Sequence, residues 1–130
     1  MPSVYISFQY DEDRRYRDLL RAMNANRRFT LDFHDGGIVR AVRSEDEARV
    51  RAVITHRIKQ VDATLVIIGR RTYLSDWVDF EIKRSIEHGV QLVALKLDRS
   101  YTTPPALYGQ NAIWVYGFVH DKITDALDQI

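Results

Sequence analysis

The stretch that decides the fold is Ala63-Thr64-Leu65-Val66-Ile67-Ile68, which carries no charge and only one hydroxyl side chain. Asp62 precedes it, and Gly69 and Arg70 follow it. A strand of a parallel sheet has this almost uninterrupted apolar character when helices cover both of its faces. We therefore predict that residues 63–68 form the central strand of a parallel sheet.

Shorter apolar stretches on either side of this run alternate with segments of helical periodicity. The further strands are predicted at Val4–Phe8, Phe29–Phe33, Val90–Leu97 and Ala112–Tyr116. The helices are predicted at Asp11–Met23, from Ser44 onward, from Ser75 to about His88, and at Asp121–Ile130. Five strands that alternate with helices imply right-handed crossovers and a parallel sheet. We predict a single α/β domain over residues 1–130 with a flavodoxin-like, three-layer fold.

The residue pattern also indicates where helices begin and which side of each faces the core. Ser44 and Glu47 have the spacing of a capping box, while Ser75 and Gly89 suit the two ends of the next helix. The apolar face of the helix after Ser44 is predicted to contain Val50, Val53, Ile54, Ile58 and Val61. The core-facing stripe of the helix after Ser75 is predicted to contain Val78, Ile82 and Ile86.

The composition is that of a globular protein and excludes several classes of function. Of the 130 residues, 45% are hydrophobic and 28% are charged, and the formal net charge is +1. This balance gives no electrostatic reason to expect nucleic acid or an anionic membrane as a partner. The absence of cysteine excludes disulfides, thiolate metal sites and cysteine nucleophiles. Because the sequence has neither a signal-peptide pattern nor an apolar run of membrane-spanning length, we expect a cytoplasmic protein.

Ligands of open parallel sheets bind beyond the carboxyl ends of the strands, which directs attention to four segments. They are Phe8–Asp11, His34–Arg43, Gly69–Trp77 and Asp98–Tyr108. No glycine-rich dinucleotide motif or P-loop follows any predicted strand. The acidic segment Gln9–Asp13 would repel the phosphate of a flavin, and the central strand lacks the terminal aspartate of a receiver domain. These α/β chemistries are therefore excluded.

Two further kinds of site find little support in the sequence. The cluster Asp32-Phe33-His34-Asp35 contains ligand-type side chains, but a solvated strand end leading into a turn explains it better than a metal site. We therefore predict no metal. A Ser-His-Asp triad stays open, although no nucleophile-elbow glycine pattern supports one.

The most informative polar residue is a glutamate on the helix after the central strand. Trp77 and Glu81 are four residues apart, so they lie on one face of that helix. On spacing alone, the commoner arrangement is a surface glutamate paired with Lys83 or Arg84. An aromatic ring beside a carboxylate is also the pairing expected where a site stacks a ring and stabilises a cation.

Several stretches of the sequence, taken together, resemble a known family. They are Val4–Phe8 with Asp11, Val61–Gly69, Thr72–Val78, and Glu81 with Ile82. This combination resembles TIR domains, in particular the TIR-like branch of bacterial and archaeal proteins that includes the signal-producing subunit of the Thoeris anti-phage system. The resemblance extends from about Ser3 to Leu97 and implies a TIR-like version of the flavodoxin-like fold.

The resemblance implies an enzyme that cleaves the bond between nicotinamide and ribose in NAD+, with NAD+ as substrate and no cofactor. The catalytic residue of enzymatic TIR domains is a glutamate on the helix after the central strand, often in a Trp-x-x-x-Glu arrangement that Trp77 and Glu81 match. The substrate-binding residues implied by the resemblance are Ser7, Phe8, Gln9, Asp11, Ser75 and Trp77. One carboxylate suffices for this reaction, because nicotinamide leaves as a neutral molecule and needs no general acid.

The TIR-like branch also implies a product and partners. The expected product is a cyclic ADP-ribose-type messenger, made in anti-phage defence after an unknown phage trigger and acting on a separate effector. The segment His34–Arg43 corresponds to the loop through which TIR domains self-associate, with Gly36 and Gly37 as its hinge. Arg40 and Arg43 could meet a diphosphate or another subunit, although solvent exposure is the simpler interpretation. Two alternatives stay open: a non-catalytic TIR-like interaction module, and a hydrolase that depletes NAD+.

Overall fold

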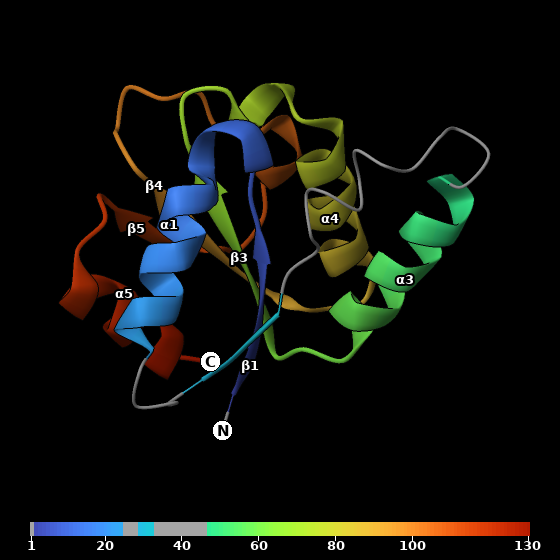
Figure 1. Ribbon diagram of the computed structural model, residues 1–130, viewed down its shortest axis with the longest axis horizontal. Coiled ribbons are helices and arrows are strands. Elements are labelled where there is room, and N and C mark those ends of the chain that lie inside the picture. The colour runs from blue at the N-terminus through green and yellow to red at the C-terminus, as the bar shows by residue number, and fades with distance from the viewer. Residues whose placement is uncertain (1, 25–28, 33–46) are drawn as a thin grey trace.

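The computed structural model describes residues 2–24, 29–32 and 47–130. Its strands are β1 (Ser3–Ser7), β2 (Thr30–Asp32), β3 (Ala63–Ile68), β4 (Gln91–Lys96) and β5 (Ile113–Tyr116). Its α-helices are α1 (Tyr10–Met23), α3 (Glu47–Lys59), α4 (Asp76–Glu87) and α5 (His120–Asp128) (Figure 1). The short 3-10 helices η2 (Thr72–Leu74) and η3 (Pro105–Leu107) precede α4 and β5.

The five strands form one parallel sheet in the order β2-β1-β3-β4-β5. β3 lies at the centre, where Leu65 is in register with Ile6 of β1 and with Val93 of β4. Every residue of β3 is buried, because strands cover both of its edges and helices cover both of its faces. The predicted parallel sheet, and the bounds of its central strand, are therefore confirmed.

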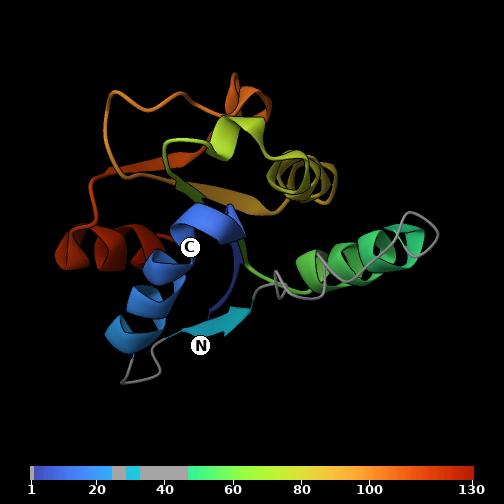
Figure 2. The same ribbon diagram turned by 45° about the horizontal axis from the view of Figure 1, so that its top comes forward.

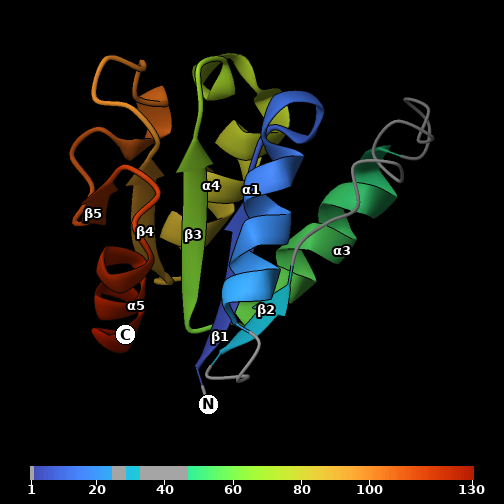
Figure 3. The same ribbon diagram turned by 60° about the vertical axis from the view of Figure 1, so that its left-hand side comes forward.

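Helices on both faces of the sheet complete the three layers that the sequence predicts. α1 and α5 lie on one face and α4 lies on the other (Figures 2 and 3). α3 packs beside α4. Because successive side chains of a strand point to opposite faces, Val4 and Ile6 of β1 join the core beneath α1 and α5. Tyr5 points the other way, into an apolar cluster between α3 and α4.

The ends of several elements differ from the prediction by one or two residues. α1 begins at Tyr10, because the backbone N–H of Glu12 donates to Gln9 Oε1 at 2.9 Å and makes Gln9 the N-cap. Ser75 caps α4 as predicted, accepting from the Val78 N–H at 3.2 Å. The predicted helix start at Ser44 and the turn His34–Gly37 lie outside the described residues. Within the described ranges, no helix is long and apolar enough to cross a lipid bilayer.

Two residues predicted to face the core are exposed instead. The exposed fraction is 48% for Val53 on α3 and 36% for Ile86 on α4. On α4, the position next to Ile86 is the buried one, since Ser85 Oγ lies 2.8 Å from both Thr64 Oγ1 on β3 and the Glu81 carbonyl. α4 is therefore rotated about its axis relative to the apolar stripe read from the sequence.

At the carboxyl ends of β1 and β3, a side chain of α1 is tied to the segment that leads into α4. Thr72 Oγ1 donates to Asp13 Oδ2 at 3.2 Å and accepts from the Gly69 N–H at 2.8 Å. Asp13 lies so close to Gly69 that a Cβ on residue 69 would sit 2.4 Å from its carboxylate oxygens. Glycine at position 69 is thus required by the close approach of the Asp13 side chain.

We predict that Gly69→Ala destabilises the protein by about 1–3 kcal/mol, because the added methyl group overlaps the Asp13 carboxylate. Urea unfolding monitored by circular dichroism would measure the loss. In the background of Asp13→Ala, which removes the carboxylate, Gly69→Ala should cost much less. Equal losses in both backgrounds would contradict the steric explanation.

A second prediction concerns the pH dependence of stability. Burial raises the pKa of Asp13 from 3.8 to about 6; the Thr72 hydrogen bond and Arg15 oppose the rise, and Glu12 adds to it. The folded state then holds the Asp13 proton more tightly than the unfolded state. The stability that proton binding at Asp13 contributes is therefore lost as pH rises from about 4 to 6. Asp13→Asn should therefore be more stable than the wild type at pH 8 and not at pH 4.

The size of this effect follows from the linkage between pKa and stability. A rise of roughly two pKa units corresponds to about 3 kcal/mol, and because Asp13 lines a cavity open to solvent we expect about 1–2 kcal/mol at pH 8. Asp121→Asn, which changes a fully solvated carboxylate on α5, is the matched control. A pH-independent difference between Asp13→Asn and the wild type would contradict the prediction.

Candidate active site

The side chain of Glu81 lies fully buried between α4 and β1. Ser7 Oγ, at the carboxyl end of β1, donates to Glu81 Oε1 at 2.8 Å, and the Tyr5 hydroxyl donates to Glu81 Oε2. Tyr5 and Ser7 are two residues apart on one strand, so they present their hydroxyls on the same face of the sheet. The structure therefore joins Glu81 to two donors of the first strand, in a group that we call the Glu81 cluster.

The surface ion pair that spacing alone suggests for Glu81 is not formed. Lys83 Nζ instead lies 2.9 Å from Asp79 Oδ2, and Arg84 Nη1 lies 2.7 Å from Glu87 Oε2. Both pairs link residues three or four positions apart along the solvent-facing side of α4. The interpretation of Glu81 as a surface glutamate is therefore wrong.

Tyr5 is the member of the Glu81 cluster that the sequence analysis missed. Its ring is fully buried in the apolar cluster with Ile54, Ile58 and Phe80. Burial, together with the neighbouring Glu81 carboxylate, holds the pKa of the Tyr5 hydroxyl well above its usual value of 10.0. Tyr5 is thus a permanent hydrogen-bond donor at physiological pH. Strand alternation could have linked Tyr5 to Ser7, but nothing local indicates that α4 turns Glu81 toward them.

Trp77 lies one helical turn before Glu81, as predicted, and is half-buried against the same apolar cluster. Its ring meets that of Phe80 edge-on, with the centroids 6.0 Å apart. The guanidinium carbon of Arg51, on α3, lies 5.2 Å from the centre of the Trp77 ring. Trp77 therefore extends the Glu81 cluster toward α3 as an aromatic surface.

The other predicted substrate-binding residues lie at different places around the start of α1 and α4. Phe8 is buried in the core on the α1 side of the sheet, opposite the face on which Ser7 meets Glu81. Gln9 is the N-cap of α1, Asp11 is exposed in its first turn, and Ser75 is the N-cap of α4. Of the predicted set, the structure brings together Ser7 and Glu81, with Trp77 adjacent.

The described residues offer no grouping suited to a metal ion. Within residues 2–24, 29–32 and 47–130, no three His, Asp or Glu side chains come together as ligands would. Asp32 is partly exposed, 3.8 Å from Arg57 Nη1. The rest of the aspartate and histidine cluster considered from the sequence, Phe33 to Asp35, lies outside the described residues.

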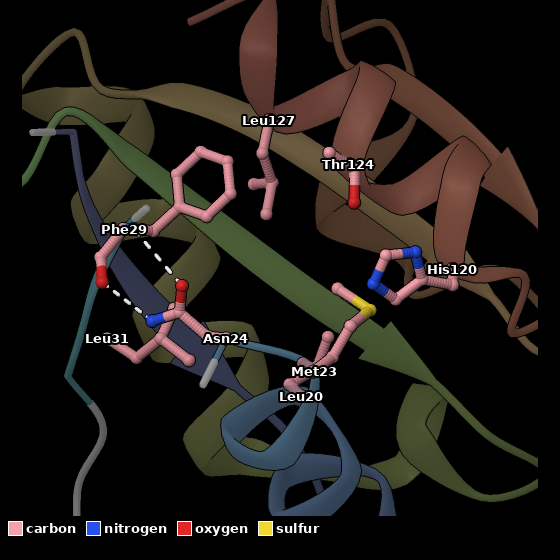
Figure 4. A pocket seen from close by; sticks show the side chains of 8 residues that line it. All are labelled: Leu20, Met23, Asn24, Phe29, Leu31, His120, Thr124 and Leu127. Carbon is pink, nitrogen blue, oxygen red and sulfur yellow. Dashed lines mark hydrogen bonds between the residues drawn. The ribbon is translucent and has the colours of Figure 1, made fainter. Parts of the chain in front are cut away.

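A small apolar cavity of about 110 Å³ lies on the opposite face of the sheet, between the end of α1, β2 and α5 (Figure 4). Asn24 closes one side of it, because Asn24 Nδ2 donates to the Phe29 carbonyl at 2.6 Å and the Phe29 N–H donates to Asn24 Oδ1 at 3.1 Å. Its other lining residues are Leu20, Met23, Leu31, His120, Thr124 and Leu127. The cavity shares no residue with the Glu81 cluster.

The sequence of residues 5–102 matches the family model described as "Thoeris protein ThsB, TIR-like domain". The match covers most of the chain and includes all members of the Glu81 cluster. The chain belongs to this TIR-like family. The family recognised from the sequence motifs is thereby confirmed. No curated protein sequence matches the chain.

Solved structures of similar fold support the same assignment at the level of architecture. This TIR-like chain resembles the CMP N-glycosidase BcmB of Clostridium botulinum, with a TM-score of 0.63 and 14% identity over 98% of this chain and 99% of that one. A 2-desoxiribosyltransferase from Leishmania mexicana gives a TM-score of 0.66 at 14% identity, covering 98% of both chains. The TIR domains of the Roq1 resistosome give 0.51 at 17% identity, over 75% of this chain and 60% of that one.

We predict that Tyr5→Phe destabilises this TIR-like chain by about 1.5–3 kcal/mol, because it removes a hydrogen bond to a buried carboxylate. Urea unfolding at pH 7 would measure the loss. Tyr108→Phe, at a tyrosine with an exposed fraction of 65%, is the matched control and should leave stability unchanged.

A double-mutant cycle separates the hydrogen bond from general packing. In the Glu81→Gln background, Tyr5→Phe removes a hydrogen bond to a neutral amide and not to a carboxylate. The loss of stability caused by Tyr5→Phe should therefore be clearly smaller there than in the wild type. An unchanged cost would mean that the Tyr5 hydroxyl does not stabilise the carboxylate.

Proposed function

We propose that this chain is a TIR-like enzyme that cleaves the nicotinamide–ribose bond of NAD+, with Glu81 as the catalytic carboxylate. The observation that carries the proposal is the Glu81 cluster, in which Tyr5 and Ser7 donate to the two carboxylate oxygens. The cluster includes Ser7 at the carboxyl end of β1, and ligands of open parallel sheets bind at this edge, beyond the carboxyl ends of the strands. A carboxylate held in one position is what electrostatic catalysis requires.

The proposed reaction needs little more than this carboxylate. When the bond between ribose C1′ and the nicotinamide nitrogen breaks, its electron pair moves to the ring and cancels the positive charge of the pyridinium. Positive charge develops on the ribose, and the negative charge of Glu81 stabilises it. Water, or a nucleophilic nitrogen of the same nucleotide, then forms the new bond to C1′ and gives up a proton to solvent.

The remaining substrate contacts are proposed for residues around the Glu81 cluster. Trp77 stacks on a ring of the substrate, and Ser7, Gln9 and Asp11 form the opposite wall, while Phe8 lies on the other face of the sheet. Ser75 contributes at the start of α4. The burial of Phe8 on the other face of the sheet makes it the weakest member of this set.

The comparisons support the reaction class by analogy. The family model names the TIR-like subunit of Thoeris. Two of the similar structures bear the names of an N-glycosidase and a deoxyribosyltransferase, names that denote chemistry at the anomeric carbon of a sugar. Because sequence identity to both is only 14%, this likeness supports the fold and leaves the reaction to be argued from the site.

The product and partners extend the proposal. A substrate shielded from water on binding would be attacked by its own base, and on this ground we propose a cyclic ADP-ribose-type messenger in preference to free ADP-ribose. In this proposal a phage-derived trigger activates the chain in anti-phage defence, TIR-type self-association assembles it, and the diffusible product activates a separate effector. NAD+ is the substrate, and no cofactor takes part.

A second candidate function is a non-catalytic TIR-like interaction module. The observation that favours it is that Glu81 has no exposed surface and is bonded by two internal hydroxyls, as a structural carboxylate would be. An enzyme that simply depletes NAD+ by hydrolysis is a third candidate, distinguished from the cyclase by its product.

The test is to incubate the protein with NAD+, with and without lysate of phage-infected cells, and to separate the nucleotides by chromatography and mass spectrometry. We expect nicotinamide release and a cyclised product from the wild type, and at least a hundredfold less from Glu81→Gln. Glu87→Gln, on the same helix and exposed, is the matched control and should keep wild-type activity.

Each outcome separates the three candidates. Identical nucleotide profiles for the wild type and Glu81→Gln under triggered conditions would contradict catalysis by Glu81 and favour the interaction module. Release of nicotinamide and free ADP-ribose, without a cyclised product, would favour the hydrolase that depletes NAD+.

A further inference from the structure

A second cavity, of about 320 Å³, lies at the carboxyl ends of β3 and β4 on the α1 side of the sheet. The first turns of α1, the segment after β3 and the loop after β4 come together at that edge (Figure 1). Its lining residues are Glu12, Asp13, Arg15, Tyr16, Gly69, Arg70, Leu97 and Tyr101. None of them belongs to the Glu81 cluster, which lies on the opposite face.

Asp13 contributes a buried carboxylate to the wall of this cavity. Its exposed fraction is 4%, and the Thr72 hydroxyl, 3.2 Å from Oδ2, holds it in place. Gly69 leaves room for it, as described above. A carboxylate oxygen accepts more than one hydrogen bond, so Asp13 retains capacity for a donor that enters the cavity.

Two arginines lie near Glu12: Arg70, which lines the cavity, and its neighbour Arg71, which does not. Arg70 Nη2 lies 3.6 Å from Glu12 Oε1, and Arg71 Nε lies 3.8 Å from the same oxygen. Arg15 is held over the ring of Tyr16, with its guanidinium carbon 4.7 Å from the ring centre, and it donates to the Tyr16 hydroxyl at 2.9 Å. The charged residues of the lining are thus two arginines, Arg15 and Arg70, and two carboxylates, Glu12 and Asp13, so their charges balance.

The position and the side chains together indicate one class of ligand. In dinucleotide-binding sheets, a carboxylate near the strand ends accepts from a ribose hydroxyl, and Asp13, in the first turn of α1, offers an acceptor of the same kind. A half-buried tyrosine such as Tyr101 offers a face on which a base can stack. Arg15 and Arg70 suit a phosphate, through charge-assisted hydrogen bonds, and they offset the repulsion that Glu12 and Asp13 would otherwise exert on it. A cavity of 320 Å³ is at the small end of the range for ligand sites.

We propose that this cavity is a binding site for a mononucleotide, separate from the Glu81 cluster. Asp13 accepts from the ribose hydroxyls, the base packs on Tyr101, and Arg15 and Arg70 bind the phosphate. Asp13 is also hydrogen-bonded to Thr72, which lies in the segment between β3 and α4. An occupant that contacts Asp13 is therefore linked through Thr72 to the helix that carries Glu81. The proposal does not depend on cleavage of NAD+.

Isothermal titration calorimetry at pH 8 tests the proposal, with AMP, GMP, CMP and UMP as ligands and with adenosine and inorganic phosphate as separate arms. We expect at least one mononucleotide to bind with a dissociation constant below 1 mM, and more tightly than adenosine or phosphate. Asp13→Asn and Tyr101→Ala should weaken binding at least tenfold, and Arg70→Ala should weaken the mononucleotide without weakening adenosine.

Control variants keep the outcome separate from the proposed enzymatic function. Glu81→Gln should bind the mononucleotide as the wild type does, even if it abolishes cleavage of NAD+, and Asp121→Asn should bind normally. Tyr101→Ala and Arg70→Ala change rim side chains, so they test the ligand contacts separately from the change in stability expected for Asp13→Asn. The proposal is overturned if no mononucleotide binds, if phosphate alone binds as tightly, or if binding is lost in Glu81→Gln and kept in the cavity variants.

Discussion

Much of the arrangement around α4 depends on the burial of one carboxylate. Glu81 has no exposed surface, and a buried charge without hydrogen-bond partners costs several kcal/mol. Tyr5 and Ser7 supply those partners from a single strand, and their hydroxyls reach Glu81 only when α4 presents that side to β1. The same rotation buries Ile82 and leaves Ile86 at the surface. The hydrogen bonds that stabilise this region therefore also set the position of the candidate catalytic residue.

The carboxyl edge of the sheet carries a second buried carboxylate, on the other face. Asp13 is bonded to Thr72, and Ser75, three residues later, caps α4. The segment from β3 to α4 is thus held at one point by α1 and at another by its own helix. Because the strand ends separate Asp13 from Glu81, the same edge presents two polar sites with different neighbours: aromatic and aliphatic side chains around Glu81, and arginines and tyrosines near Asp13.

The fold was largely predictable, and the composition of the candidate site only partly so. Strand alternation by itself separates Ser7 from Phe8, which therefore point to opposite faces of β1. The set of substrate-binding residues implied by the family resemblance, which includes both, did not use this constraint. The predicted core-facing stripe of α4 was right for Val78 and Ile82 and wrong for Ile86. Residues spaced by four move gradually around a helix that has 3.6 residues per turn, so the third of them leaves the buried face. Ser85 takes the buried position, and its partner Thr64 lies on a different element.

The sequence by itself determined the order and kind of the elements, the central position of β3 and the N-cap of α4. These features follow from local patterns: an unbroken apolar run, alternating helices and strands, and a serine three residues before the amide that it caps. Only the tertiary structure decided that Tyr5 bonds Glu81 and that Asp13 meets Thr72. Those pairs are 76 and 59 residues apart in the chain, and they form because parallel strands bring distant segments to the same edge of the sheet.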